Sequence, residues 1–136
     1  MDDKVRKNNI DWDFWLLMPH VKIWQAVALS IDIDPKKMTG RMTSKGPQFY
    51  SKSFRTIKEQ NDFDRRCELL IARVLNTNDI RIVFISNVSI DSEIYLNSFV
   101  DWVLSVEWNI PQELRIIATA KEKISILEKS YSSNKI

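Results

Sequence analysis

Apolar residues recur at helical spacing along much of this chain. Four of them fall at i, i+3, i+4 and i+7 and therefore share one face of a helix expected between residues 21 and 31: Trp24, Val27, Ala28 and Ile31. Similar apolar faces or capping signals predict helices in four other segments: 11–18, 61–76, 97–106 and a last one from 110. Helices therefore make up most of the expected structure.

Helix-ending and helix-starting residues mark the limits of these segments. Pro19 and Pro35 are expected to end the first two helices, because the residue before a proline avoids the helical conformation. Asn61 and Asn97 are expected N-caps, since a short polar side chain can accept a hydrogen bond from the first turn of a helix. Pro111 suits the first turn of the last helix.

Strand-like sequence occurs in one region. Residues 80–85 are rich in β-branched apolar side chains, and after a turn at 86–89 the stretch 90–96 has a similar character. We expect these two stretches to pair as a hairpin. The sequence thus predicts a mainly α fold of the α+β type: a single compact domain over residues 1–136, with four to five helices, one small β-hairpin and a frayed C-terminus at 130–136.

Charge is distributed unevenly along the chain. The net charge is +2, from 20 Lys and Arg against 18 Asp and Glu. Residues 35–58, here called the basic segment, contain seven basic residues and no acidic one, so the remaining 13 basic residues face all 18 acidic ones. The segment is also rich in Ser, Thr, Gly and Pro, which predicts a long loop. Such a charge cluster favours a polyanionic partner.

Three aromatic residues lie among these charges. Basic side chains suit contacts with phosphates, and aromatic ones suit stacking on bases or packing against the body of the protein. A solvated loop without a partner is the alternative interpretation. The residues predicted to bind nucleic acid or another partner are Lys36, Lys37, Arg41, Lys45, Lys52, Arg55, Lys58, Phe49, Tyr50 and Phe54.

Composition narrows the class of protein. A chain of 136 residues with 44% apolar side chains can bury a substantial core. The single cysteine, Cys67, excludes an intramolecular disulfide and a metal site made of several cysteines. The first nine residues are highly charged, and no apolar run approaches the roughly 18 residues of a membrane span. We therefore expect a cytoplasmic protein that does not enter a membrane.

The residues that usually carry out catalysis are sparse. His20, the only histidine, follows a proline at a turn and is interpreted as a surface or capping residue. Cys67 falls on an apolar helix face, where cysteine acts as a small hydrophobe. Turns and helix ends explain two carboxylate pairs: Asp32 with Asp34, and Asp62 with Asp64. The two glycines fit no phosphate-binding motif. We expect no enzyme, no catalytic residues, no metal, no cofactor and no small-molecule substrate.

Two stretches resemble a known kind of protein. Residues 18–35 read MPHVKIWQAVALSIDIDP, and residues 95–114 read YLNSFVDWVLSVEWNIPQEL. They resemble a family of short bacterial proteins, often associated with prophages or other mobile elements, that share a WxAVALS helix ending in IDP and an LxxFxxW helix followed by IPxxL. The matching positions are Trp24, Ala26 to Ser30, Ile33 to Pro35, Leu96, Phe99, Trp102, Ile110, Pro111 and Leu114. The resemblance implies a fold and a setting, but no reaction.

A weaker likeness connects the 21–31 helix with helix-turn-helix proteins of the excisionase type, through Gln25, Ala26 and Leu29. In those proteins a tight turn and a recognition helix follow, whereas here the basic segment follows. This departure argues against a standard recognition helix in the major groove.

Three hypotheses for function result. The leading one is a small non-enzymatic binding protein of phage or mobile-element origin that engages nucleic acid, or another polyanionic surface, through the basic segment. The second is an inhibitor of a host defence system that blocks a nuclease by protein–protein contact, as anti-CRISPR proteins do, with acidic residues imitating nucleic acid. The third is a structural module that dimerises through exposed aromatic residues.

Overall fold

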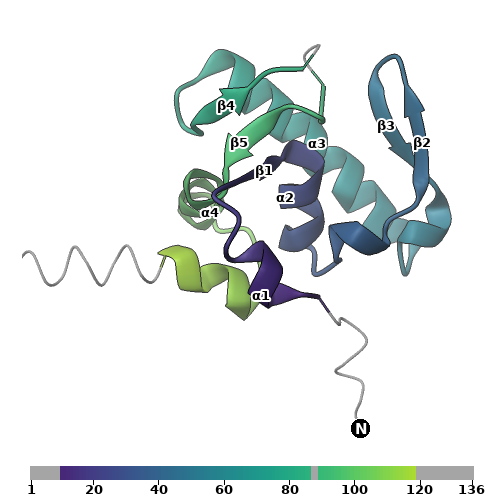
Figure 1. Ribbon diagram of the computed structural model, residues 1–136, viewed down its shortest axis with the longest axis horizontal. Coiled ribbons are helices and arrows are strands. Elements are labelled where there is room, and N and C mark those ends of the chain that lie inside the picture. Colours follow the sequence, from purple (N-terminus) through teal and green to yellow (C-terminus); the bar gives the residue numbers. More distant parts are fainter. Residues whose placement is uncertain (1–9, 87–88, 119–136) are drawn as a thin grey trace, which may run out of the picture.

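The computed structural model describes residues 10–86 and 89–118 (Figure 1). Its elements include short 3-10 helices, labelled η, beside α-helices and strands. In chain order they are α1 (Trp12–Trp15), β1 (His20–Lys22), α2 (Ile23–Ser30), η2 (Pro35–Lys37), β2 (Gly40–Thr43), β3 (Gly46–Phe49), η3 (Ser51–Ser53), α3 (Ile57–Asn76), β4 (Ile82–Phe84), β5 (Glu93–Tyr95) and α4 (Leu96–Ser105). Residues 112–118 form a further helix.

The described residues form two antiparallel sheets. The first has three strands in the order β1-β5-β4, and the second is the β2–β3 hairpin. Figure 1 shows α2 in the middle of the molecule, with the three-stranded sheet and α4 on one side and the β2–β3 hairpin on the other. Both sheets consist of strands of three or four residues, and the longer elements of the described chain are helices.

This architecture corrects the predicted fold class. A mainly α fold with one small hairpin is wrong: the chain is α+β, with helices and two separate antiparallel sheets. The expected pairing of residues 80–85 with 90–96 is present as β4 against β5. The error came from two segments. His20 was placed at a turn and residues 21–22 at the start of a helix, but residues 20–22 form β1, which pairs with β5. The basic segment was expected to be a loop but contains β2 and β3.

The core lies where α2, α3 and α4 meet the three-stranded sheet. Residues 26–30 of α2 are all buried, because this helix is surrounded on several sides. In contrast, α3 buries a single stripe consisting of Phe63, Cys67, Leu70 and Val74, at the spacing of an amphipathic helix. On α4 the expected face is buried as well, with Phe99 and Val103 fully enclosed.

Two helix starts differ from the predicted ones. The helix expected from Asn61 begins at Ile57, because the Thr56 hydroxyl accepts a hydrogen bond of 3.0 Å from the Glu59 amide. Thr56 and Glu59 have the spacing of a capping box, a stronger signal than Asn61. The helix expected from Asn97 begins one residue earlier, and no side chain caps it. Both helices end close to their expected ends. The part of the last helix beyond residue 118, and the predicted fraying at 130–136, lie outside the described residues.

Candidate functional site

A tight turn gives the basic segment its shape. β2 and β3 pair antiparallel as far as Thr43 opposite Gly46, which leaves Ser44 and Lys45 as a two-residue turn. Gly46 has a φ of 105°, in the left-handed region that glycine tolerates well. The Thr43 hydroxyl donates to the Gly46 carbonyl oxygen over 2.7 Å and accepts from the Lys45 amide. These contacts hold Lys45 at the tip of the hairpin.

The base of the hairpin is closed by hydrogen bonds. The Tyr50 amide donates to the Thr39 carbonyl oxygen over 2.9 Å, and the Ser53 hydroxyl bonds to both the amide and the carbonyl of Thr39. At the start of β2, a Cβ on Gly40 would lie 2.3 Å from the Gln48 carbonyl oxygen, so only glycine permits the two strands to come this close. The hairpin therefore starts and returns at one fixed point.

Two of the three predicted aromatic residues hold the basic segment against the body. The Phe49 ring centroid lies 4.7 Å from that of Trp24 and 5.7 Å from that of Phe63. Phe54 is only 8% exposed and its ring centroid lies 5.2 Å from that of Phe63. Tyr50 is different, since 47% of it is exposed. Of the three rings, Tyr50 is the one whose position suits stacking on a ligand.

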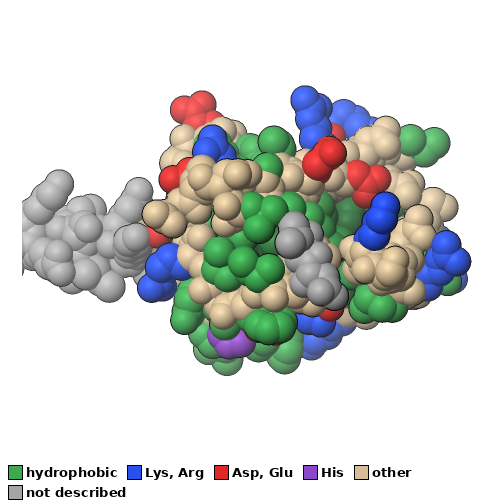
Figure 2. Space-filling model, turned by 90° about the horizontal axis from the view of Figure 1, so that it is seen from above, with side chains coloured by type: hydrophobic (Ala, Val, Ile, Leu, Met, Phe, Trp, Pro, Cys, Tyr) green, Lys and Arg blue, Asp and Glu red, His purple; other side chains and the backbone are tan. Residues whose placement is uncertain are grey.

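Three of the seven predicted basic residues have exposed charges on or beside the hairpin. Arg41 lies on β2, where its Nε donates to the Gln48 side-chain oxygen over 3.2 Å, and Lys45 lies at the tip. Lys52 follows β3, with its Nζ 6.0 Å from the Tyr50 ring centroid. Among the ion pairs between described residues, none involves Arg41, Lys45 or Lys52. Figure 2 shows Lys and Arg side chains gathered at this end of the molecule.

Two other basic residues of the segment, Lys36 and Lys58, are paired with carboxylates of the same chain. Lys36 Nζ lies 3.2 Å from an Asp11 carboxylate oxygen and 3.7 Å from the Phe14 ring centroid. Lys58 pairs with Asp62 over 3.1 Å within α3. These contacts reduce what Lys36 and Lys58 can contribute to a partner. Lys37, the last residue of η2, is exposed.

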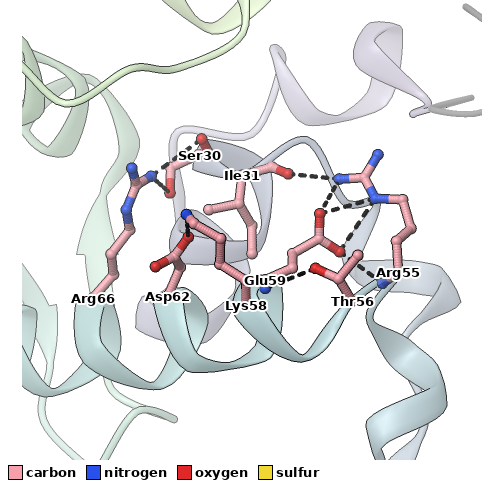
Figure 3. Close-up of polar contacts among 8 residues, drawn as sticks. All are labelled: Ser30, Ile31, Arg55, Thr56, Lys58, Glu59, Asp62 and Arg66. Carbon is pink, nitrogen blue, oxygen red and sulfur yellow. Dashed lines mark hydrogen bonds and ion pairs between the residues drawn. The ribbon is translucent and has the colours of Figure 1, made fainter.

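Arg55 joins the ends of two helices (Figure 3). Its guanidinium donates to Glu59 and, over 3.0 Å, to the Ile31 carbonyl oxygen that follows α2. From the opposite side, Arg66 donates to the Ser30 hydroxyl over 2.9 Å, and burial lowers the pKa of Arg66 while the charge of Asp62 opposes that shift. Positive groups at a helix C-terminus interact favourably with its dipole. Arg55 therefore acts mainly in joining α2 to α3.

Three of the basic side chains line one small pocket. Lys37, Lys52 and Arg55 border a space of about 210 Å³ beside the base of the hairpin, and Asp32 and Asp34 border it as well. The carboxylates offset much of the positive charge. This pocket therefore contains side chains of both charges and is not a purely basic site.

Asp34 anchors the start of the basic segment. It is buried, and its carboxylate accepts hydrogen bonds from the Asp11 amide, the Lys36 amide and the Trp15 indole, at 2.9 to 3.1 Å. Burial raises the pKa of Asp34, but these hydrogen bonds and the nearby Lys36 charge outweigh burial, so the pKa is lowered overall. The sequence placed Asp34 in the turn that ends the 21–31 helix, and in the structure it lies after α2 and caps the start of η2.

The two residues considered for catalysis take structural positions. His20 Nδ1 lies 2.9 Å from a Glu93 carboxylate oxygen on the neighbouring strand. Cys67 is buried, and burial together with the Asp64 charge raises its pKa far above the ordinary range, which keeps the thiol protonated. No group of three or more metal-ligating side chains occurs among residues 10–86 and 89–118. Within the same ranges, no helix is long and apolar enough to span a bilayer.

Comparison of the chain with protein families, curated proteins and solved structures finds no match in any of the three. The resemblance of residues 18–35 and 95–114 to short bacterial proteins therefore stays a prediction. The charges and exposed side chains on the surface of the molecule are therefore the basis for the proposed function.

Proposed function

We propose that the chain binds nucleic acid through the outer surface of the β2–β3 hairpin and its flanks. Arg41, Lys45 and Lys52 would contact phosphates, and the exposed ring of Tyr50 would stack on a base. The observation that supports this most strongly is the set of three exposed cations on a fixed scaffold, in a segment without one acidic residue. The protein would act by covering part of the nucleic acid, without catalysing a reaction.

We also propose a cellular location and an origin for the protein. The single cysteine and the highly charged first nine residues support a cytoplasmic location, and the resemblance of residues 18–35 and 95–114 supports a phage or mobile-element origin. The inhibitor hypothesis is less favoured, because three of the acidic residues that would imitate nucleic acid already contact basic side chains of the same chain. Asp11 pairs with Lys36, Asp91 pairs with Lys22, and Glu93 contacts His20.

Fluorescence anisotropy with single- and double-stranded DNA and RNA, across roughly 50 to 300 mM salt, tests the proposal. The variant Arg41→Gln with Lys45→Gln is expected to bind single-stranded DNA at least about tenfold more weakly, with a salt slope reduced by about 1.4. The matched control is Arg73→Gln with Arg81→Gln, which removes the same charge elsewhere. Both control residues are exposed, on α3 and just before β4.

Two outcomes contradict the proposal. One is no binding of any nucleic acid even at the lowest salt concentration, which would direct attention to protein partners. The other is an equal loss of binding in both double variants, because net charge rather than the hairpin would then account for the interaction.

A further inference from the structure

A groove lies between the end of α3 and strand β4. Its volume is about 730 Å³, within the range of roughly 300–1,000 Å³ that is common for pockets that hold small ligands. Residues 74–78 and 80–82 form most of its lining, together with Ile85 and Tyr95. Figure 1 shows the chain leaving α3 at this point and turning back into β4. The lining is part apolar and part polar, so the two parts are considered in turn.

The apolar part of the lining is accessible to a ligand. Leu75, Ile82 and Ile85 line the groove, and each is more than a third exposed. Val74 and Ile80, which also line it, are buried. Covering exposed aliphatic side chains with the apolar part of a ligand is favourable, because it removes their surface from water.

Two polar side chains of the lining already have partners. The Asn76 side-chain amide donates to the Ala72 carbonyl oxygen over 2.8 Å. The Thr77 hydroxyl donates to the Arg73 carbonyl oxygen over 2.8 Å and accepts a hydrogen bond from the Asp79 amide. These contacts close the C-terminal end of α3, so neither side chain requires a ligand.

Two backbone amides of the lining have no partner. Among residues 10–86 and 89–118, no oxygen accepts a hydrogen bond from the amide of Asn78 or Ile80, whereas the Arg81 amide donates to the Ser98 hydroxyl over 2.7 Å. Ile80 is only 1% exposed, and a buried amide without a hydrogen bond is unfavourable. Because both residues line the groove, an oxygen atom of a ligand there can accept from these amides.

Arg81 makes the same end of the groove positive. Its guanidinium lies 4.4 Å from the Tyr95 ring centroid, and both residues line the groove. Among the ion pairs between described residues, none involves Arg81. No acidic residue is part of the lining, and the nearby Asp79 pairs with Arg73 over 3.3 Å. An unpaired guanidinium beside free amides favours an anionic oxygen, above all that of a carboxylate.

We propose that the groove binds a small carboxylate with an aliphatic tail, such as a medium-chain fatty acid. Its carboxylate accepts hydrogen bonds from the Arg81 guanidinium and the Ile80 amide, and its tail covers the exposed aliphatic side chains of α3 and β4. An extended peptide suits the groove less well, because it needs regular hydrogen bonds along a strand edge, whereas the register of β4 is irregular between Ile82 and Phe84. A hydrocarbon tail needs no hydrogen bonds.

An NMR titration of the full labelled chain with octanoate, decanoate and dodecanoate at pH 7, each up to about 2 mM, tests this inference. Saturable shift changes are expected at amides of residues 74–82 and at Tyr95. Full burial of two methylene groups strengthens binding about fifteenfold, and a groove open to solvent covers roughly half of each. Each step in chain length should therefore lower the dissociation constant about fourfold.

Two pairs of variants test the head and the tail of the ligand separately. Arg81→Gln should weaken decanoate binding at least about tenfold, whereas Arg65→Gln, which removes the same charge from an exposed position of α3 outside the groove, should not. Leu75→Gln should weaken it about fivefold. Its control is Leu69→Gln, since Leu75 and Leu69 are 45% and 46% exposed on the same helix and only Leu75 lines the groove. Circular dichroism of each variant checks folding.

Several outcomes would overturn the proposal. One is the absence of saturable shifts in residues 74–82 with any of the three carboxylates, and another is equal weakening by the two arginine variants or by the two leucine variants. Tighter binding of a soluble hexapeptide with an apolar C-terminal residue than of decanoate would assign the groove to a peptide instead. None of these measurements contains nucleic acid, so their result is independent of the function proposed for the hairpin.

Discussion

The β2–β3 hairpin and strand β4 belong to the same body but meet solvent with opposite kinds of side chain. The hairpin turns its aromatic residue Phe49 inward, against Trp24 and Phe63, and carries charged residues on its exposed surface. On β4 the exposed residues are apolar, and none is charged. Water solvates the hairpin charges well, whereas exposed apolar area is unfavourable until it is covered. The polyanionic partner proposed for the hairpin therefore would not suit the uncharged exposed surface of β4.

The two regions also differ in how firmly they join the core. The hairpin is fixed through the ring contacts of Phe49 and by the hydrogen bonds at its base. β4 is held by its pairing with β5, with an irregular register between Ile82 and Phe84. Substitutions at the hairpin's anchors should consequently reduce stability, and substitutions of exposed residues on β4 should not.

The largest expected effect is at Phe63. This ring is 2% exposed and contacts both Phe49 and Phe54, so Phe63→Ala should lower the free energy of unfolding by about 3–5 kcal/mol. It should also speed amide hydrogen exchange in β2 and β3 more than in β4. Urea denaturation and hydrogen exchange measure the two effects. Phe84→Ala serves as the control and should change stability by less than about 0.5 kcal/mol. Equal losses at the two positions would remove the contrast between the regions.

Asp34 gives the next largest effect and a dependence on pH. Because its pKa is lowered in the folded state, its stabilisation is complete above the unfolded value of 3.8 and is lost as pH falls through the folded pKa. Asp34→Asn should cost about 1–3 kcal/mol at pH 7 and much less at pH 2. Urea titrations at several pH values measure this difference. A cost that is the same at pH 2 and pH 7 would contradict the role of the charged carboxylate.

Thr56 caps the start of α3, where the basic segment leads into this helix. Its hydroxyl accepts the Glu59 amide hydrogen bond, so Thr56→Ala should reduce the free energy of unfolding by about 1 kcal/mol. Thr56→Ser keeps the acceptor and should restore most of that loss. If serine is no better than alanine, the cap is not the source of the effect.

The smallest effect is expected at Asp64, beside the hairpin on α3. Burial raises its pKa, and the Glu68 charge one helical turn away raises it further. A carboxyl with a raised folded pKa destabilises the protein once pH exceeds its unfolded value. Asp64 is exposed and solvent screens this effect, so Asp64→Asn should stabilise the fold at pH 7 by only about 0.2–0.5 kcal/mol. The gain should disappear below pH 3. Thermal unfolding at the two pH values detects it, and a loss of stability at pH 7 would contradict it.

Local patterns made part of the fold predictable from the sequence. The α3 stripe that includes Cys67, the end of that helix at Asn76, and the pairing of 80–85 with 90–96 were all expected and are present. The three-residue strand β1 was not foreseeable, since residues 20–22 become a strand only through pairing with β5, which is distant in sequence. The β2–β3 hairpin was missed because Ser44 and Lys45 form its turn without the Asn-Gly signal, although Gly46 follows them.

The charge of the candidate site could be predicted from the sequence, but the contacts that each of its residues makes could not. The sequence showed that seven basic residues lie together, yet pairing decides which of them remain available. Lys36 and Lys58 meet acidic partners, and Arg55 bridges α2 and α3. Phe54 is buried against Phe63, which only the three-dimensional arrangement reveals. The exposed character of β4 was missed for the same reason: an apolar strand predicts burial, and its edge position is a property of the sheet.

An NMR titration of the labelled chain with a short single-stranded oligonucleotide at low salt would locate the nucleic-acid-binding surface. We expect amide shifts to change at residues 40–53, centred on Arg41, Lys45 and Tyr50, and to stay constant at 82–85. Raising the salt concentration should reverse the changes. No shift at any amide, or shifts concentrated at 82–85, would contradict the hairpin as the nucleic-acid-binding surface.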